Sequence, residues 1–98
     1  MEPFKEYYYK NENIKCEKYY NANNGLHRED GPAYTCYYKN GQVKYELYYI
    51  NRKLHREDGP AYICYYENGN IEYEKYYIND ELHKEDGPEW VGYYQNGN

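Results

Sequence analysis

Several residue types are absent or scarce in this 98-residue chain, and each shortage argues against a class of protein. The sequence has no serine, no glycine-rich phosphate loop and no Cys-x-x-Cys pair, so common nucleophile, nucleotide and zinc motifs are missing. It also lacks a basic excess, because 12 Lys and Arg stand against 17 Asp and Glu, for a net charge of -5. Binding through nucleic-acid phosphates or an anionic membrane surface needs such an excess, so both are disfavoured.

Long apolar runs and a leader sequence are missing as well. No run could cross a bilayer, and the N-terminal MEPFKEYYYK lacks the apolar core of a secretion signal. We therefore predict a cytoplasmic location. The three cysteines, Cys16, Cys36 and Cys64, are odd in number. Without a secretion signal they favour reduced thiols packed on strands and give no support to a disulfide framework.

Tyrosine takes the place of the scarce aliphatic residues. The chain has 19 Tyr but only one Trp, one Phe and one Met, and it has too few Leu, Ile and Val for an aliphatic core. Tyr rings must therefore supply the buried area, while each hydroxyl stays hydrogen-bonded or hydrated. This composition predicts a thin structure with much surface.

A 28-residue repeat organises the sequence. The octapeptide LHREDGPA begins at Leu26 and again at Leu54, and the variant LHKEDGPE begins at Leu82. Such periods are typical of repeat proteins, in which neighbouring units bury a shared core. We divide a single domain into a half unit (1–25), two full units (26–53 and 54–81) and a final half unit (82–98).

Each full unit carries two strand signals joined by Asn-Gly. The runs AYTCYY and AYICYY begin a strand, and VKYELYYI and IEYEKYYI follow the turn. Asn-Gly between such runs favours a two-residue type I′ turn, in which both residues take positive φ. The predicted pairs are Tyr66 with Ile71, Cys64 with Tyr73, and Tyr62 with Lys75. The predicted fold is all-β, an elongated, twisted antiparallel sheet of stacked β-hairpins.

The octapeptide has a catalytic and a structural interpretation. His27, His55 and His83 recur beside Glu and Asp, as metal ligands or acid–base pairs would. Equivalent atoms two strands apart lie about 9–10 Å from each other at a strand spacing of about 4.8 Å. A zinc ion needs its ligand atoms about 2 Å away. We therefore expect salt-bridged loops with an Asp-Gly-Pro turn, in which Gly takes positive φ, and no catalytic residue, metal site or cofactor.

The stretch YYENGNIEYEKYYINDELHKEDGP resembles the MORN-variant repeats of the YwqK type. Those repeats combine a Tyr-Tyr-x-Asn-Gly hairpin, a second Tyr-x-x-Asn-Gly turn and a polar link. The LHREDGPA form is similar to repeats of bacterial, phage and large-DNA-virus proteins, and the resemblance covers nearly the whole chain. Arg52 and Asp80 stand where the family favours Gly in the second turn. The resemblance implies stacked hairpins and a role in protein interaction, with antitoxins among the proposed functions.

These patterns predict a non-enzymatic protein-binding inhibitor. We expect a phage or mobile-element protein that blocks a bacterial defence nuclease, such as a CRISPR effector, in the host cytoplasm. Tyr and Glu side chains would meet a basic, nucleic-acid-binding groove of the target, without direct contact to nucleic acid or membrane. The predicted partner-binding residues are Tyr37, Glu46, Tyr48, Tyr65, Glu72, Glu74, Tyr76 and Trp90. The alternatives are an antitoxin that binds a toxin and a sponge that holds a nucleotide between Tyr rings.

The C-terminal strand predicts self-association. The strand expected from about residue 89 to 95 has no following partner in the sequence, and an unpaired edge is a template for pairing. Trp90 replaces Tyr62 of the preceding unit. We expect Trp90 to be buried in a homodimer through this edge strand or by the target itself.

Overall fold

The computed structural model describes residues 4–8, 14–84 and 87–96, so Glu85 and Asp86 of the third octapeptide lie outside it. The described elements are all β-strands, which confirms the all-β class. Aromatic and β-branched residues fill them, as strand propensity requires. The strands are β1 (Phe4–Tyr8), β2 (Ile14–Tyr19), β3 (Tyr34–Tyr37), β4 (Val43–Leu47), β5 (Tyr49–Ile50), β6 (Lys53–Leu54), β7 (Tyr62–Tyr65), β8 (Ile71–Lys75), β9 (Tyr77–Ile78), β10 (Glu81–Leu82) and β11 (Trp90–Gly92).

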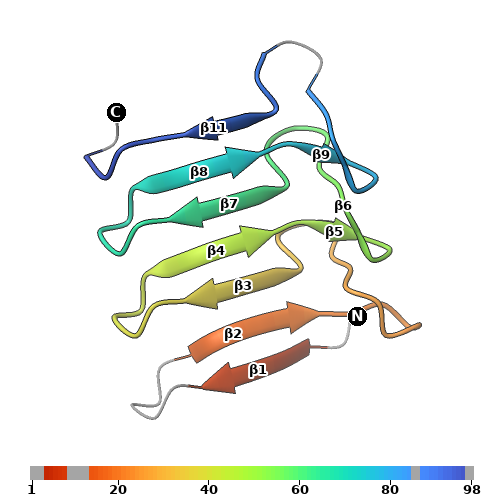
Figure 1. The fold of residues 1–98 in the computed structure, drawn as a ribbon. Coiled ribbons are helices and arrows are strands. Elements are labelled where there is room, and N and C mark those ends of the chain that lie inside the picture. Colours follow the sequence, from red (N-terminus) through yellow and green to blue (C-terminus); the bar gives the residue numbers. More distant parts are fainter. Residues whose placement is uncertain (1–3, 9–13, 85–86, 97–98) are drawn as a thin grey trace.

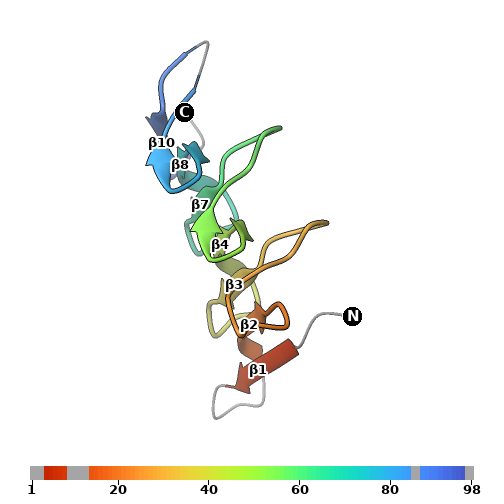
Figure 2. The same cartoon turned by 90° about the vertical axis from the view of Figure 1, so that its right-hand side faces the viewer.

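Seven strands form one antiparallel sheet in the order β1-β2-β3-β4-β7-β8-β11, which is also their order along the chain. In Figure 1 they lie side by side, from red β1 to blue β11, and the short hairpins β5–β6 and β9–β10 extend from the ends of β4 and β8. The molecule measures 39 × 35 × 16 Å. It is a single layer, as the Tyr-rich composition predicts, and Figure 2 shows this layer from its edge.

Equivalent strands stand 28 residues apart in the two middle hairpins. β3 begins at Tyr34 and β7 at Tyr62, while β4 begins at Val43 and β8 at Ile71. The short hairpins keep the same spacing, because β5 and β9 begin at Tyr49 and Tyr77. The spacing of these elements therefore equals the period of the sequence motif.

The first turn of each unit differs from the prediction. Cys64 pairs with Tyr73 and Tyr62 with Lys75, as predicted, but Tyr65 rather than Tyr66 stands opposite Ile71. The cause is the turn, because Gly69 N–H donates to Tyr66 O at 3.0 Å and Tyr66 N–H donates to Asn70 O at 2.8 Å. Only Gly69 takes positive φ (94°), so this is a three-residue loop with a glycine bulge, and the two-residue type I′ turn predicted here is wrong.

The two-residue turn occurs instead at the second turn of each unit. Ile50 pairs with Lys53, and the residues between them, Asn51 and Arg52, have φ of 49° and 72°. Asn79 and Asp80 repeat this geometry with φ of 50° and 69°. Here Arg52 adopts a backbone conformation that costs least for glycine and that Asn and Asp tolerate better than other residues.

Small side chains provide the buried core. Ala33 and Ala61 have no exposed surface, and no large side chain in the described ranges is fully buried. The other buried side chains in the described ranges are those of Cys16, Thr35, Cys36, Leu47 and Ile63. The Tyr rings whose burial the structure describes therefore pack over both faces of the sheet, and each keeps some contact with water.

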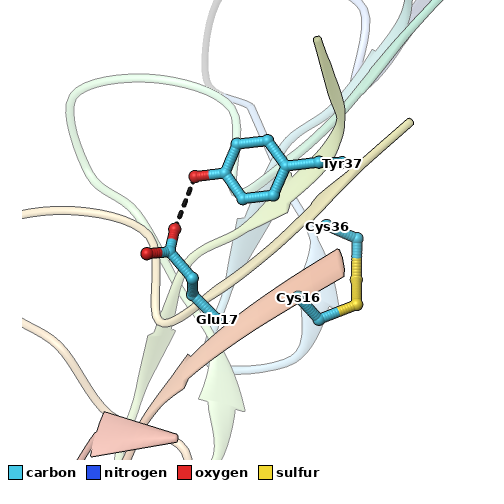
Figure 3. Close-up of a disulfide and its surroundings, with 4 residues drawn as sticks. All are labelled: Cys16, Glu17, Cys36 and Tyr37. Atoms are coloured by element: carbon cyan, nitrogen blue, oxygen red, sulfur yellow. Dashed lines mark hydrogen bonds between the residues drawn. A yellow bond between two sulfur atoms is a disulfide. The ribbon is translucent and has the colours of Figure 1, made fainter. Parts of the chain in front are cut away.

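A disulfide joins Cys16 of β2 to Cys36 of β3 (Figure 3). These residues stand directly opposite each other in the sheet, with their Cα atoms 4.1 Å apart. The prediction of reduced thiols is therefore wrong for this pair, whereas Cys64 is free. The reason lies in the repeat, because Cys16 occupies the position that Tyr45 holds opposite Cys64 in the next unit.

Candidate functional site

One face of the sheet carries a regular row of glutamates. The residues paired across the strands are, in order, Glu17, Thr35, Glu46, Ile63, Glu74 and Val91. From β2 to β11 every second position in this row is a carboxylate with an uncharged residue between, and on β1 Glu6 stands directly opposite Glu17. We call this side the Tyr/Glu face, and four of the predicted partner-binding residues, Tyr37, Glu46, Tyr65 and Glu74, belong to it.

Tyr hydroxyls from each hairpin bind the glutamates of the preceding one. Tyr65 Oη donates to Glu46 Oε1 at 2.6 Å, and Tyr93 Oη donates to Glu74 Oε1 at 2.9 Å. Tyr37 makes the equivalent bond to Glu17 (Figure 3). We call these three pairs the Tyr–Glu ladder. It ties neighbouring hairpins together, so these predicted residues also have a structural role.

The ladder keeps its tyrosines protonated. Burial, followed by the hydrogen bond to Glu46 and its charge, raises the pKa of Tyr65 well above its ordinary value. Burial and Glu17 raise the pKa of Tyr37 in the same way, and the hydrogen bond to Glu74 raises that of Tyr93. An ionised carboxylate that accepts one such bond has further lone pairs for other donors. The Tyr/Glu face therefore remains acidic.

Two equivalent grooves lie between successive octapeptide loops, which rise from one side of the sheet (Figure 2). Their volumes are about 660 and 580 Å³. The predicted residues Tyr76 and Tyr48 each line one groove, and residues 55–58 line both. The larger is lined by His55, Arg56, Glu57, Asp58, Gly59, Tyr76, Ile78, His83 and Lys84. The structure thus brings the octapeptide together with two of the predicted tyrosines.

An arginine closes each of the first two octapeptide loops. Arg56 Nε donates a hydrogen bond to Asp58 Oδ1, and its Nη1 donates to Pro60 O, both at 3.2 Å. The same guanidinium lies 4.0 Å above the centre of the Tyr48 ring. Arg28 repeats these contacts. Gly59 does not take positive φ, contrary to the prediction, whereas the equivalent Gly87 of the third octapeptide does, at 129°. A Cβ there would lie 3.0 Å from Arg56 Cζ, so the glycine gives room to the guanidinium.

The histidines connect each loop to the next hairpin. His55 Nδ1 accepts a hydrogen bond from Asn79 N at 3.2 Å, and its Nε2 lies 3.2 Å from Glu57 Oε2. His27 Nδ1 accepts from Asn51 N at 2.9 Å. An accepting Nδ1 places the proton of the neutral ring on Nε2, where it can reach the glutamate. In the described part of the chain, no group of three His, Cys, Asp or Glu side chains could hold a metal ion.

Carboxylates at the loop tips are the most exposed charges near the grooves, and the sequence-based prediction omitted them. The side chains of Glu29 and Asp30 are 81% and 88% exposed, and those of Glu57 and Asp58 are 82% and 89% exposed. The repeated Glu-Asp of the octapeptide was the available signal. The sequence-based interpretation of this Glu-Asp pair is a salt-bridged loop edge, and the four carboxylates do form such ion pairs with the His and Arg of the same loop.

Trp90 lies apart from the other predicted residues. It continues a row of aromatic rings on the opposite face, 6.4 Å from the Tyr73 centroid, and it is 61% exposed. Glu72 is half-buried on β8, in the stretch where the register shifts. The predicted set therefore divides between the Tyr/Glu face, the grooves and the opposite face.

Comparison of the chain with protein-family models, curated proteins and solved structures gives no match. The resemblance to MORN-variant repeats therefore stays a prediction based on the repeat motif. No helix able to span a membrane occurs in the described ranges.

Proposed function

We propose that this protein is a non-enzymatic binding module whose acidic grooved side occupies a basic surface of another protein. The supporting observation is the repetition of Glu29 and Asp30 at Glu57 and Asp58, more than 80% exposed at the rims of grooves that contain Tyr48 and Tyr76. Complementary charge speeds association and selects partners. Rigid Tyr rings add contact area at low entropic cost.

The proposed target is a nuclease of bacterial defence, such as a CRISPR effector, blocked in the host cytoplasm at its nucleic-acid groove. An antitoxin would use the same surface against a basic toxin. A nucleotide sponge receives less support, because Arg56 and Lys84 already lie 4.0 and 4.3 Å above the rings of Tyr48 and Tyr76. A base would have to displace those cations before it could stack.

The proposed cytoplasmic location has to be reconciled with the Cys16–Cys36 disulfide. Bacterial cytosol keeps most thiols reduced, whereas the structure joins Cys16 to Cys36. Both residues are buried, at 9% and 4% exposed, so access of a reductant to the bond is restricted. The module must either protect this bond or fold without it.

The proposal is tested by capture and charge reversal. The tagged chain is incubated with bacterial lysate, and bound proteins are identified by mass spectrometry and challenged with DNA. We expect a nucleic-acid-binding protein that DNA releases and that the double variant Glu57→Lys with Asp58→Lys no longer retains. The matched control, Glu67→Lys with Glu81→Lys, makes the same charge change at exposed positions that do not line the grooves. Equal retention by both variants would refute the role of the loops.

A further inference from the structure

A continuous row of aromatic rings crosses the face opposite the glutamates. Consecutive centroids are 5.7 Å apart for Tyr34 and Tyr45, 6.4 Å for Tyr45 and Tyr62, 5.6 Å for Tyr62 and Tyr73, and 6.4 Å for Tyr73 and Trp90. The rings meet at interplanar angles of 49–87°, within the range of favourable tilted and edge-to-face contacts. We call this side the aromatic face.

Small residues make room for this row. One row of residues paired across neighbouring strands consists of Cys36, Tyr45, Cys64, Tyr73 and Gly92. In this row a small residue separates each Tyr ring from the next. The neighbouring row places Tyr34, Leu47, Tyr62, Lys75 and Trp90 in line. Each aromatic ring therefore contacts a ring of the other row on the neighbouring strand, and the contacts run diagonally across the sheet. The result is one connected apolar strip from β3 to β11.

No second layer covers this strip in the described part of the chain, although its Tyr rings are half-buried by their neighbours. The sheet is a single layer in Figure 2, whereas domains usually bury a sheet face against a second layer. The chain exposes 6602 Å², and a compact 12.1 kDa monomer exposes about 6,000 Å². Trp90, a residue type that is often an interface anchor, is 61% exposed at the end of the strip.

The distribution of charge decides which face can meet a second copy. The two paired rows of the aromatic face contain the lysines Lys5, Lys18 and Lys75 and no carboxylate. The ammonium groups of the last two lie against rings: Lys18 is 4.8 Å from the Tyr34 centroid, and Lys75 is 5.5 Å from that of Trp90. Their long stems can cover apolar surface while the charge stays at the margin. The glutamate row would make the other face repel its copy.

We propose that two copies of the chain pack their aromatic faces together as a β-sandwich homodimer. A standard interface buries about 800 Å² on each partner, and a sheet with extents of 39 × 35 Å offers more than that. Aligned sheets pack at about 10 Å and bury both inner faces. The acidic grooved sides then point outward, so the dimer presents two docking surfaces. The pairing itself does not depend on the proposed function.

The oligomeric state tests this proposal directly. Light scattering and sedimentation should give about 24 kDa, twice the chain mass of 12.1 kDa, at tens of micromolar, with dissociation on dilution. The chain has one Trp, so its fluorescence reports on Trp90 alone. Its emission should shift to shorter wavelength, and acrylamide quenching should fall, as the dimer forms.

Variants separate this face from the edge-strand dimer that the sequence predicts. Tyr45→Arg, in a central strand, should weaken the dimer by about tenfold or more, as loss of a central interface ring does. Trp90→Arg, at an exposed position, repeats the test with little risk to folding, and circular dichroism checks both variants. Lys44→Glu is the matched control, because it changes the exposed neighbour of Tyr45 on the same strand.

Three results would overturn the face-to-face dimer. The first is a 12.1 kDa monomer at all concentrations. The second is a dimer that withstands Tyr45→Arg but dissociates with Val91→Pro, which would locate the contact at the β11 edge. The third is equal loss of the dimer in Lys44→Glu and Tyr45→Arg.

Discussion

The hydroxyl of Tyr65 donates a 2.6 Å hydrogen bond to the carboxylate of Glu46 in the preceding hairpin. Tyr65 is the last residue of β7 and Glu46 lies in β4, so the bond spans the junction between two units. The same bond recurs between Tyr93 and Glu74. The units are thus connected by side chains as well as by backbone pairing, which explains why Tyr and Glu recur at the same positions.

Removing one hydroxyl of the ladder should destabilise the fold. Tyr65→Phe leaves the half-buried Glu46 without its donor, and loss of a hydrogen bond to a charged group costs about 1.5–3 kcal/mol. Urea denaturation followed by circular dichroism should show this loss. Tyr94→Phe is the control, because Tyr94 is 77% exposed and should change stability by less than about 0.5 kcal/mol. Equal midpoints for the two variants would show that the ladder contributes nothing.

Alkaline pH should unfold the protein through its tyrosines. Burial raises the pKa of Tyr45, Tyr65 and Tyr73 above the ordinary value of 10.0, so the folded state holds protons that the unfolded chain releases. Their contribution is fully present below pH 10 and is lost as pH rises from there toward the raised values. Absorbance at 295 nm and circular dichroism should change together above pH 10. Gradual ionisation near pH 10 with an intact sheet would contradict this.

The sequence predicted the register around Cys64 and Tyr73, because Asn-Gly locates the turn. It did not predict the shift at Tyr65, since the loop depends on a local bond in which Asn68 Oδ1 accepts from Asn70 N at 2.9 Å. The Cys16–Cys36 pair was predictable by aligning the N-terminal unit with the next one. The grooves were not, because they depend on where Arg56 folds back over Tyr48, which no periodicity reveals.

Loss of the disulfide should lower stability without abolishing the sheet. Cys16 and Cys36 are 20 residues apart, and closing a loop of that size stabilises a fold by about 3 kcal/mol in the chain-entropy model. Denaturation of the Cys64→Ala variant with and without dithiothreitol measures this difference, because the variant keeps only the bonded pair. The strand pairing around Cys36 should persist in amide exchange after reduction. No difference between the two conditions would mean that the bond does not form in solution.

Replacement by glycine should change stability in opposite directions at Arg52 and Asp80, the equivalent residues of the two second turns. Arg52 and Asp80 both take positive φ, at 72° and 69°, and glycine relieves about 1 kcal/mol of such strain. Arg52 is exposed, and its side chain makes one hydrogen bond, Nη2 to Asn23 O at 3.1 Å, so Arg52→Gly should stabilise the fold by about 0.5–1 kcal/mol.

Asp80 differs because its Oδ1 accepts a 2.6 Å hydrogen bond from Leu54 N. A bond to a charged group contributes about 1.5–3 kcal/mol, so Asp80→Gly should lower stability by about 1 kcal/mol despite the relieved strain. Asp80→Asn keeps an acceptor and tolerates positive φ, and it should stay near the unmodified protein. Urea midpoints compare the three variants. A gain in stability for Asp80→Gly equal to that for Arg52→Gly would show that backbone strain alone governs both turns.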